Sequence, residues 1–217
     1  MYKQVFKPFL DFIIALAVFA LLLPVFIIIT TVLYIANDGK PFFYQIRPGK
    51  NEKLFTIIKF KTMNDKKDAS GNLLPDVERL TLMGNFIRKT SLDEIPQLLN
   101  VIKGDMSLIG PRPLLPEYLP FYNTNHRRRH EVKPGITGLA QIAGRNSIKF
   151  SKRFALDVEY VNKVSFLLDC KIIWHTITRL FKSEEIRTGQ TVDEVDDVGV
   201  SKNLPAYHFR RIENADQ

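Results

Sequence analysis

The chain has 217 residues and a net charge of +8, with one cysteine and four histidines. The length suits one domain, or one domain with an appendage, and the single cysteine, Cys170, excludes an intrachain disulfide, which fits a reducing compartment. The scattered histidines have no zinc-ligand spacing, and the positive charge favours a phosphate-bearing partner such as nucleic acid, anionic lipid or a phosphorylated small molecule.

An apolar segment comes first in the chain. Residues 12–37 carry no charged side chain, and they are long enough to cross a bilayer as one helix, which is the simpler interpretation. Pro24 lies near their midpoint and predicts a kink or a break. Basic residues flank both ends: Lys3 and Lys7 before, and Lys40, Arg47 and Lys50 after. Because such loops stay cytoplasmic, residues 1–37 are predicted to be a re-entrant helix-break-helix.

The remaining elements predict a mixed α/β domain, mainly helical, over residues 38–182. Two short strands joined by a polar turn are expected at 41–47 and 54–63, followed by a loop at 64–76. Apolar periodicity favours helices at 78–89, 95–103, 117–130, 154–161 and 167–181, some of them amphipathic and interfacial. Glycine and proline make 104–116 and 132–146 irregular, with one short strand in the latter. The polar composition of 183–217 predicts a tail.

Two adjacent acids, Asp93 and Glu94, lie within TSLDEIPQ at 90–97. Ser91 and Glu94 form a capping-box pattern, so both acids are explained simply as helix-start charges. Pro96 favours a helix that starts nearer Asp93, where a carboxylate is kept ionised. An ionised carboxylate can attack phosphorus, and paired carboxylates suit Mg²⁺ together with substrate phosphates. Structural and catalytic interpretations therefore both remain open at this point.

Phosphate substrates need cations near these acids, and the chain offers Lys59, Lys61, Arg88, Arg112 and Arg145. For each cation alone, a solvated surface charge is the simpler interpretation. Arg112 differs because it lies between Pro111 and Pro113, which constrain its backbone. The basic run at 127–129 is expected near anionic lipid headgroups.

Four long stretches of the sequence resemble the bacterial sugar transferase family, the monotopic polyprenyl-phosphate phosphoglycosyl transferases. They are PFFYQIRPGKNEKLFTIIKFKTM, TLMGNFIRKTSLDEIPQLLNVIKGDMSLIGPRP, RHEVKPGITGLAQIAGR and DVEYVNKVSFLLDCKII. The resemblance extends from about residue 7 to residue 181, and it is closest to small single-domain members.

This resemblance implies an enzyme that moves a phosphosugar from a UDP-sugar to polyprenyl (undecaprenyl) phosphate and releases UMP. It places the enzyme at the cytoplasmic face of the inner membrane, in contact with phospholipid and upstream of later glycosyltransferases. Asp93 would be the nucleophile that carries a covalent phosphosugar, and Glu94 would position the metal or the acceptor. Both would contact Mg²⁺. The small members favour an N-acetylated amino sugar such as diacetylbacillosamine.

Further residues gain roles from the same resemblance. The substrate contacts would be Lys59, Arg88, Pro111, Arg112, Pro113 and Arg145. The membrane helix would break at Pro24, although Leu23 stands where relatives often have serine. Lys7 and Asp11 would anchor it at the interface. The acids at 157 and 169 match family acids or are partners of buried cations.

A second hypothesis is a membrane-anchored basic protein that binds anionic lipid or nucleic acid without catalysis. It has no need for paired acids among arginine-bearing loops, and the chain shows no aromatic platform for stacking nucleic-acid bases. A family member with degenerate activity is a third hypothesis, which the presence of both Asp93 and Glu94 disfavours.

Overall fold

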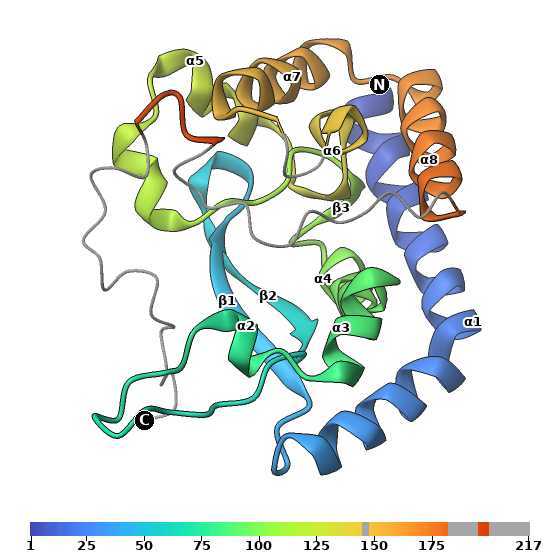
Figure 1. The fold of residues 1–217 in the computed structure, drawn as a ribbon. Helices are drawn as coiled ribbons and strands as arrows, with labels where there is room; N and C mark the ends of the chain where they lie inside the picture. Colours follow the sequence, from blue (N-terminus) through green and yellow to red (C-terminus); the bar gives the residue numbers. More distant parts are fainter. Residues whose placement is uncertain (145–147, 182–194, 200–217) are drawn as a thin grey trace.

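A computed structural model describes residues 1–144, 148–181 and 195–199. The described part is mainly helical, with a long N-terminal helix along one side and small two-stranded sheets near the middle (Figure 1). This confirms the predicted mixed, mainly helical class. Arg145, a predicted phosphate contact, lies outside the described residues, as does most of the predicted tail.

The long helix α1 spans Lys7–Ala36 and is preceded by a π-helical turn, Tyr2–Phe6. It is continuous through Pro24, so the predicted separation into two helices is not seen, although the helix changes direction along its length (Figure 1). By length and composition, Tyr2–Ala36 is able to cross a membrane. Most of its apolar side chains are exposed, which indicates membrane association because water disfavours so large an apolar surface.

Both ends of α1 are held by polar contacts. Lys7 Nζ lies 2.9 Å from Asp169 Oδ2 and 3.6 Å from Asp11 Oδ2. At the other end, Asn37 Nδ2 donates to the Lys61 carbonyl at 2.8 Å. Lys7, Asp11 and Asp169 are all buried, so the interpretation of Asp169 as the partner of a buried cation is confirmed.

The predicted hairpin is confirmed. Strand β1, Phe42–Pro48, pairs antiparallel with β2, Leu54–Phe60, across a 3-10 turn at Lys50–Glu52. The Phe60 ring on β2 lies 5.3 Å from the Phe26 ring of α1, centroid to centroid. Aromatic burial therefore fixes the hairpin against the long helix.

The prediction of one continuous helix at 78–89 is wrong. The structure has α2 at Asp76–Arg79 and α3 at Leu82–Lys89. Between them, Leu80 forms an isolated β-bridge with Met63. Thr81 then caps α3, because its Oγ1 accepts from the Gly84 N–H at 2.9 Å.

Helix α4 spans Gln97–Lys103 and ends at Gly104, whose φ of 90° suits a glycine C-cap, as predicted. The next segment is not wholly irregular, because β3, Ser107–Ile109, pairs parallel with β4, Gly135–Thr137. The two backbones approach so closely that a Cβ on Gly135 would lie 2.1 Å from the Gly110 nitrogen. Strand β4 is the short strand predicted within 132–146, whereas β3 was not predicted.

The predicted helix at 117–130 is also wrong. The structure has a 3-10 segment at Pro116–Phe121, α5 at Thr124–Arg127 and a 3-10 turn at Arg128–Glu131. Asn123 restarts the helix, since its Oδ1 accepts from the His126 N–H at 2.8 Å.

The C-terminal helices are α6, α7 and α8. Helix α7 spans Phe150–Lys163 and α8 spans Phe166–Phe181, close to the predicted positions, whereas α6 at Leu139–Gly144 was not predicted. The described part of the tail packs back on the domain. There, Val195 is buried in an apolar cluster, and Asp197 accepts hydrogen bonds from Ser151 at the start of α7.

A candidate active site built on the acid pair

The acid pair lies in a 3-10 turn, Leu92–Glu94, between α3 and α4. Ser91 precedes it with a φ of 57° and makes no capping bond, so the capping-box prediction is wrong. The left-handed residue turns the chain sharply after α3. Asp93 therefore lies in a tight turn before α4 and not in the first turn of that helix.

Glu94 is held by two cations. Its Oε1 accepts from Lys59 Nζ at 2.7 Å and from Arg112 Nη2 at 3.0 Å. Strand β2 supplies Lys59, and the loop after β3 supplies Arg112, so three predicted site residues meet here. Burial alone would raise the pKa of Glu94, but Arg112 and Lys59 lower it to about 2. Glu94 is therefore a fixed anion.

Asp93 is held much less tightly. Its Oδ2 lies 3.8 Å from Lys59 Nζ, and its side chain makes no hydrogen bond to the described residues. Burial raises the pKa of Asp93 above its ordinary value, while Lys59 is the strongest opposing influence. This direction is opposite to the one expected from a helix start. The Asp93 oxygens are thus available to a substrate, unlike Oε1 of Glu94.

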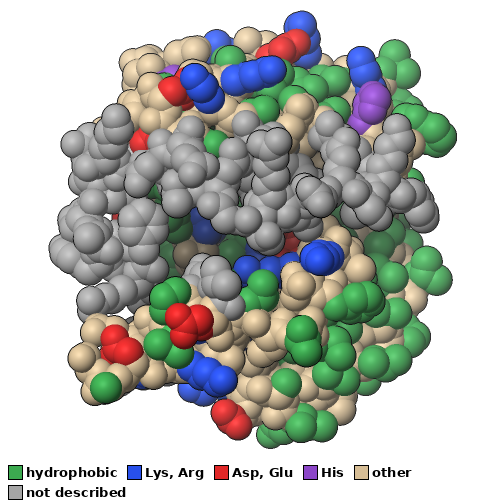
Figure 2. Space-filling view, viewed as in Figure 1, with side chains coloured by type: hydrophobic (Ala, Val, Ile, Leu, Met, Phe, Trp, Pro, Cys, Tyr) green, Lys and Arg blue, Asp and Glu red, His purple; other side chains and the backbone are tan. Residues whose placement is uncertain are grey.

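Two other predicted cations have different surroundings. Arg88, in the last turn of α3, donates from Nε to Thr62 Oγ1 at 2.7 Å and also lowers the pKa of Asp93. Lys61 is buried and pairs with Asp65, so it belongs to the loop after β2 and not to the acid pair. In Figure 2, lysine and arginine side chains gather around the hollow in the middle of this face.

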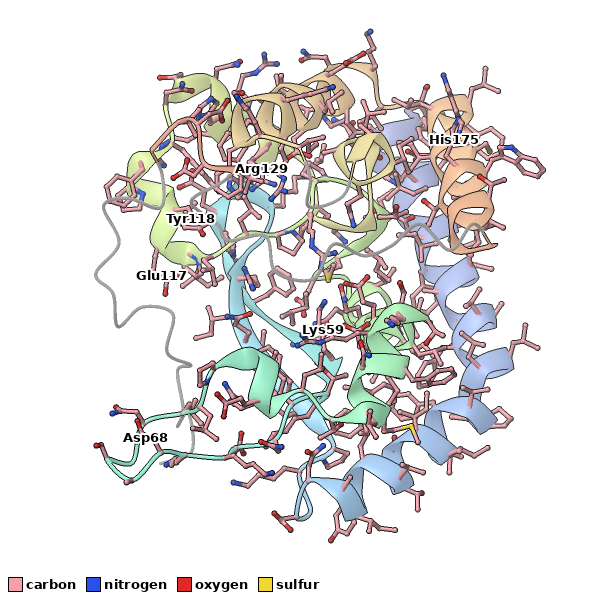
Figure 3. The ribbon with its side chains drawn as sticks, viewed as in Figure 1. Lys59, Asp68, Glu117, Tyr118, Arg129 and His175 are labelled. Carbon is pink, nitrogen blue, oxygen red and sulfur yellow. The ribbon has the colours of Figure 1, made fainter. Side chains whose placement is uncertain are left out.

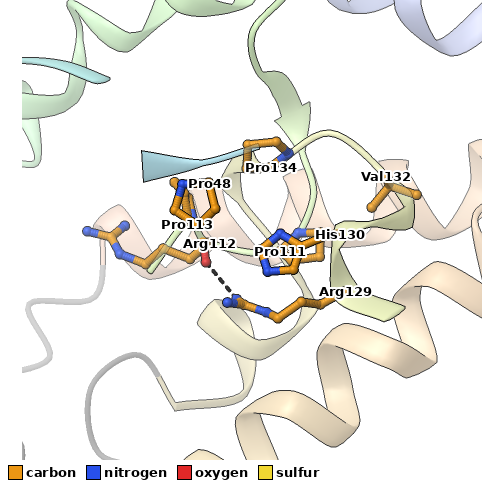
Figure 4. Close-up of a pocket in the computed structure, with 8 residues that line it drawn as sticks. All are labelled: Pro48, Pro111, Arg112, Pro113, Arg129, His130, Val132 and Pro134. Carbon is orange, nitrogen blue, oxygen red and sulfur yellow. Dashed lines mark hydrogen bonds between the residues drawn. The ribbon is translucent and has the colours of Figure 1, made fainter. Parts of the chain in front are cut away.

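The loop that carries Arg112 is fixed by a buried ion pair that the sequence did not reveal. Arg129 Nη2 lies 2.7 Å from Asp157 Oδ2 and donates to the Arg112 carbonyl at 2.6 Å (Figure 4). Arg129 and Asp157 are each 2% exposed, so the expectation that the whole run 127–129 meets lipid headgroups is wrong for Arg129. Nothing in a run of three arginines indicates which one is buried.

A small pocket lies beside this loop. It is lined by Pro48, Pro111, Arg112, Pro113, Arg129, His130, Val132 and Pro134 (Figure 4). His130 Nδ1 lies 3.2 Å from the Gly49 carbonyl, and burial lowers the pKa of His130 to about 4, so the ring is neutral. The predicted Pro111, Arg112 and Pro113 therefore border one site together. Figure 3 shows Lys59 near the middle of the fold, below Arg129.

A magnesium site has limited support from these residues. Within the described ranges, no group of three or more His, Cys, Asp or Glu side chains could hold a metal. The acid pair supplies hard oxygen ligands, but Oε1 of Glu94 already accepts from two cations. Such a set fits Mg²⁺ held mainly by substrate phosphates with one or two carboxylates, and it does not fit an all-protein cage.

Comparison with known proteins identifies the family of this chain. The sequence model of a family described as bacterial sugar transferase matches residues 2–183. The chain belongs to the bacterial sugar transferase family. It is therefore a transferase, and the hypothesis of a binding protein without catalysis is set aside.

The chain is also similar to several individual proteins. An uncharacterized sugar transferase, EpsL of Bacillus subtilis, is 56% identical over 164 residues, which cover 75% of this chain and 81% of that protein. A UDP-glucose:undecaprenyl-phosphate glucose-1-phosphate transferase of Caulobacter vibrioides is 33% identical over 82% of this chain and 70% of that protein. The galactosyl transferase CpsE of Streptococcus agalactiae is 43% identical over 79% of this chain but only 41% of its own length.

Proposed function

We propose that this chain transfers a sugar 1-phosphate from a UDP-sugar to polyprenyl phosphate and releases UMP. The reaction proceeds in two steps through a covalent phosphosugar on Asp93. The observation that carries the proposal is the division of labour between the two acids. Lys59 and Arg112 hold Glu94, whereas Asp93 faces Lys59 at 3.8 Å without a hydrogen bond.

In the first step, an Asp93 oxygen forms a bond to the phosphorus that bears the sugar. The bond from that phosphorus to the bridging oxygen breaks, and the oxygen leaves with its electron pair as part of UMP. Lys59 lies beside the attacked phosphate, where its charge offsets the negative charge that develops. Arg112 is 40% exposed along its side chain, so it can contact the diphosphate while it remains bonded to Glu94.

In the second step, a phosphate oxygen of polyprenyl phosphate attacks the same phosphorus. The bond to Asp93 breaks, and the carboxylate is restored for the next turnover. One site therefore serves a soluble donor and a lipid acceptor in turn. Covalent catalysis of this kind replaces one difficult displacement by two easier ones.

When bound, Mg²⁺ would supply charge neutralisation for the diphosphate. Asp93 and the second carboxylate oxygen of Glu94 are the protein groups that would hold it. Undiminished UMP release in excess chelator would rule out this role for the metal.

A monotopic, re-entrant placement at the cytoplasmic face of the inner membrane is part of the proposal. At the start of α1, Lys7 forms an ion pair with Asp169 of α8. At the end of α1, Asn37 donates a hydrogen bond to the Lys61 carbonyl, and the chain continues into β1. Both ends of the helix thus contact the same domain, which supports entry and exit on one face. The acid pair would then lie at headgroup height, where the acceptor phosphate must remain.

The names of the relatives favour glucose or galactose over an N-acetylated amino sugar as the transferred group. Purified protein in detergent should release UMP continuously from UDP-glucose or UDP-galactose when polyprenyl phosphate is present. Without polyprenyl phosphate, UMP release should stop after a single turnover. A panel of UDP-sugars, including UDP-N-acetylated amino sugars, identifies the donor. Absence of UMP release from every donor in the panel would contradict the proposed function. The lipid-linked product would pass to later glycosyltransferases.

A further inference from the structure

The cations around the acid pair already have protein partners. Lys59 and Arg112 bond to the carboxylate of Glu94, whereas Arg88 donates to the neutral hydroxyl of Thr62 and its charge acts on Asp93, where the attacked phosphate must lie. A diphosphate donor brings further negative charge, most of which must be neutralised when the substrate leaves water. A phosphate that departs with the nucleotide therefore needs at least one cation that no carboxylate occupies.

Arg47 is such a cation. It lies in β1, is partly buried, and donates from Nη2 to Gln45 Oε1. Among the described residues, no carboxylate comes within ion-pair distance of Arg47. Glu117 is close enough to raise its pKa but makes no ion pair with it. A partly buried guanidinium without a counter-ion is unfavourable, because burial removes hydration that no anion replaces.

Two observations place Arg47 next to the site. Arg47 lies two and four residues after Gln45 and Phe43 on β1, and Phe43 pairs with Lys59 of β2, so the Arg47 and Lys59 side chains project from the same face of the hairpin. Burial and then the charge of Arg112 lower the pKa of Arg47 to about 10, so the two guanidiniums are neighbours and both remain charged at neutral pH. Arg47 and Arg112 are two positive charges that have only one carboxylate, Glu94, as an ion-pair partner between them. They therefore form a site for an additional anion.

The order of contacts indicates which phosphate binds there. Asp93 lies beside Lys59, and Glu94 connects Lys59 to Arg112. Arg47 projects from the neighbouring strand β1, on the same face of the hairpin as Lys59. The attacked phosphorus must lie at Asp93, so the phosphate farther along the substrate reaches the two arginines.

We propose that Arg47, together with Arg112, binds the phosphate that leaves with UMP. The inference rests on the proposed function and deepens it. When Asp93 bonds to the sugar-bearing phosphorus, the bridging oxygen takes the electron pair and becomes part of the UMP phosphate. Arg47 stabilises that charge by donating hydrogen bonds to the departing phosphate.

The test is inhibition by UMP, measured in the detergent assay with the wild type, Arg47→Gln and Arg47→Lys. Arg128→Gln is the matched control, because Arg128 is a surface arginine that pairs with Glu131 away from the acid pair. Loss of a charged hydrogen bond predicts that the inhibition constant for UMP rises about 10- to 100-fold in Arg47→Gln. Arg47→Lys keeps the charge and should show a smaller rise, while Arg128→Gln should match the wild type.

Melting curves show whether each variant is folded, and Arg47→Lys serves as the test if Arg47→Gln is not. A wild-type inhibition constant in folded Arg47→Gln, or in Arg47→Lys where only that variant folds, overturns the inference while leaving the proposed function intact. A wild-type protein that neither turns over nor binds UMP overturns both. These two failures are therefore distinguishable in one experiment.

Discussion

At the scale of single residues, the two adjacent acids have opposite electrostatic surroundings. Two cations lower the pKa of Glu94 to about 2, while burial raises the pKa of Asp93. The sequence identifies the pair, because two acids beside a proline stand out. The sequence does not reveal which of the two acids accepts hydrogen bonds from the cations, since Lys59 and Arg112 are 35 and 18 residues away from Glu94 along the chain.

Lys59→Gln should move the acidic limb of the activity profile to higher pH. Lys59 is the strongest group that lowers the pKa of Asp93, so its removal raises that pKa, and ionised Asp93 is lost at a higher pH. We also expect kcat/KM at neutral pH to fall about 100-fold. The measurement is kcat/KM across pH, with Arg128→Gln as the control.

Glu94→Gln should shift the pH profile in the opposite direction. The charge of Glu94 raises the pKa of Asp93, so the variant's residual activity should have its acidic limb at lower pH. Identical limbs in Lys59→Gln and Glu94→Gln would show that Asp93 does not control the profile.

At the scale of elements, the sequence predicts best where one residue fixes a boundary. The hairpin and the Gly104 cap were predicted because polar turns and glycine act locally. The helix at 117–130 failed because Asn123 caps a new helix inside it. The short strand predicted within 132–146 is found as β4, whereas β3 and its parallel pairing with β4 depend on contacts between distant segments that the sequence does not show.

The ion pair between Arg129 and Asp157 joins α7 to the loop that carries Arg112. Asp157→Ala should lower the free energy of unfolding by about 3–5 kcal/mol, because it leaves a buried guanidinium without a partner. The control is Glu159→Ala on the same helix, whose pair with Lys163 is solvent-exposed and is expected to contribute less than about 1 kcal/mol.

Denaturant unfolding in detergent compares the two helix variants with the wild type. Equal losses in Asp157→Ala and Glu159→Ala would mean that burial does not set the strength of the Arg129 pair. The sequence offered Asp157 as a possible partner of a buried cation, but the identity of that cation required the fold.

At the scale of the whole molecule, the apolar helix and the catalytic domain form one body. Lys7 and Asp169 are 162 residues apart in sequence yet 2.9 Å apart in space. Composition predicted the apolar helix, and Pro24 predicted a distortion in it. The sequence could not predict that the helix would bend without interruption, because that depends on the domain packed against its length.

A topology measurement tests the re-entrant arrangement. Single cysteines replace Gln4 and Asn51, both exposed positions, in a Cys170→Ser background. In intact cells, both should be shielded from a membrane-impermeant thiol reagent, because both ends of α1 are expected to face the cytoplasm. Both should react after permeabilisation. Labelling of the cysteine at position 4 alone in intact cells would mean that α1 spans the bilayer.

The most direct test of the central claim is the intact mass of the protein after exposure to the UDP-sugar donor without polyprenyl phosphate. We expect a mass increase of one phosphosugar, located on the peptide that contains Asp93 and removed when polyprenyl phosphate is added. Asp93→Asn should show neither the adduct nor transfer. Substantial transfer by Asp93→Asn, or an adduct on another residue, would show that Asp93 is not the nucleophile.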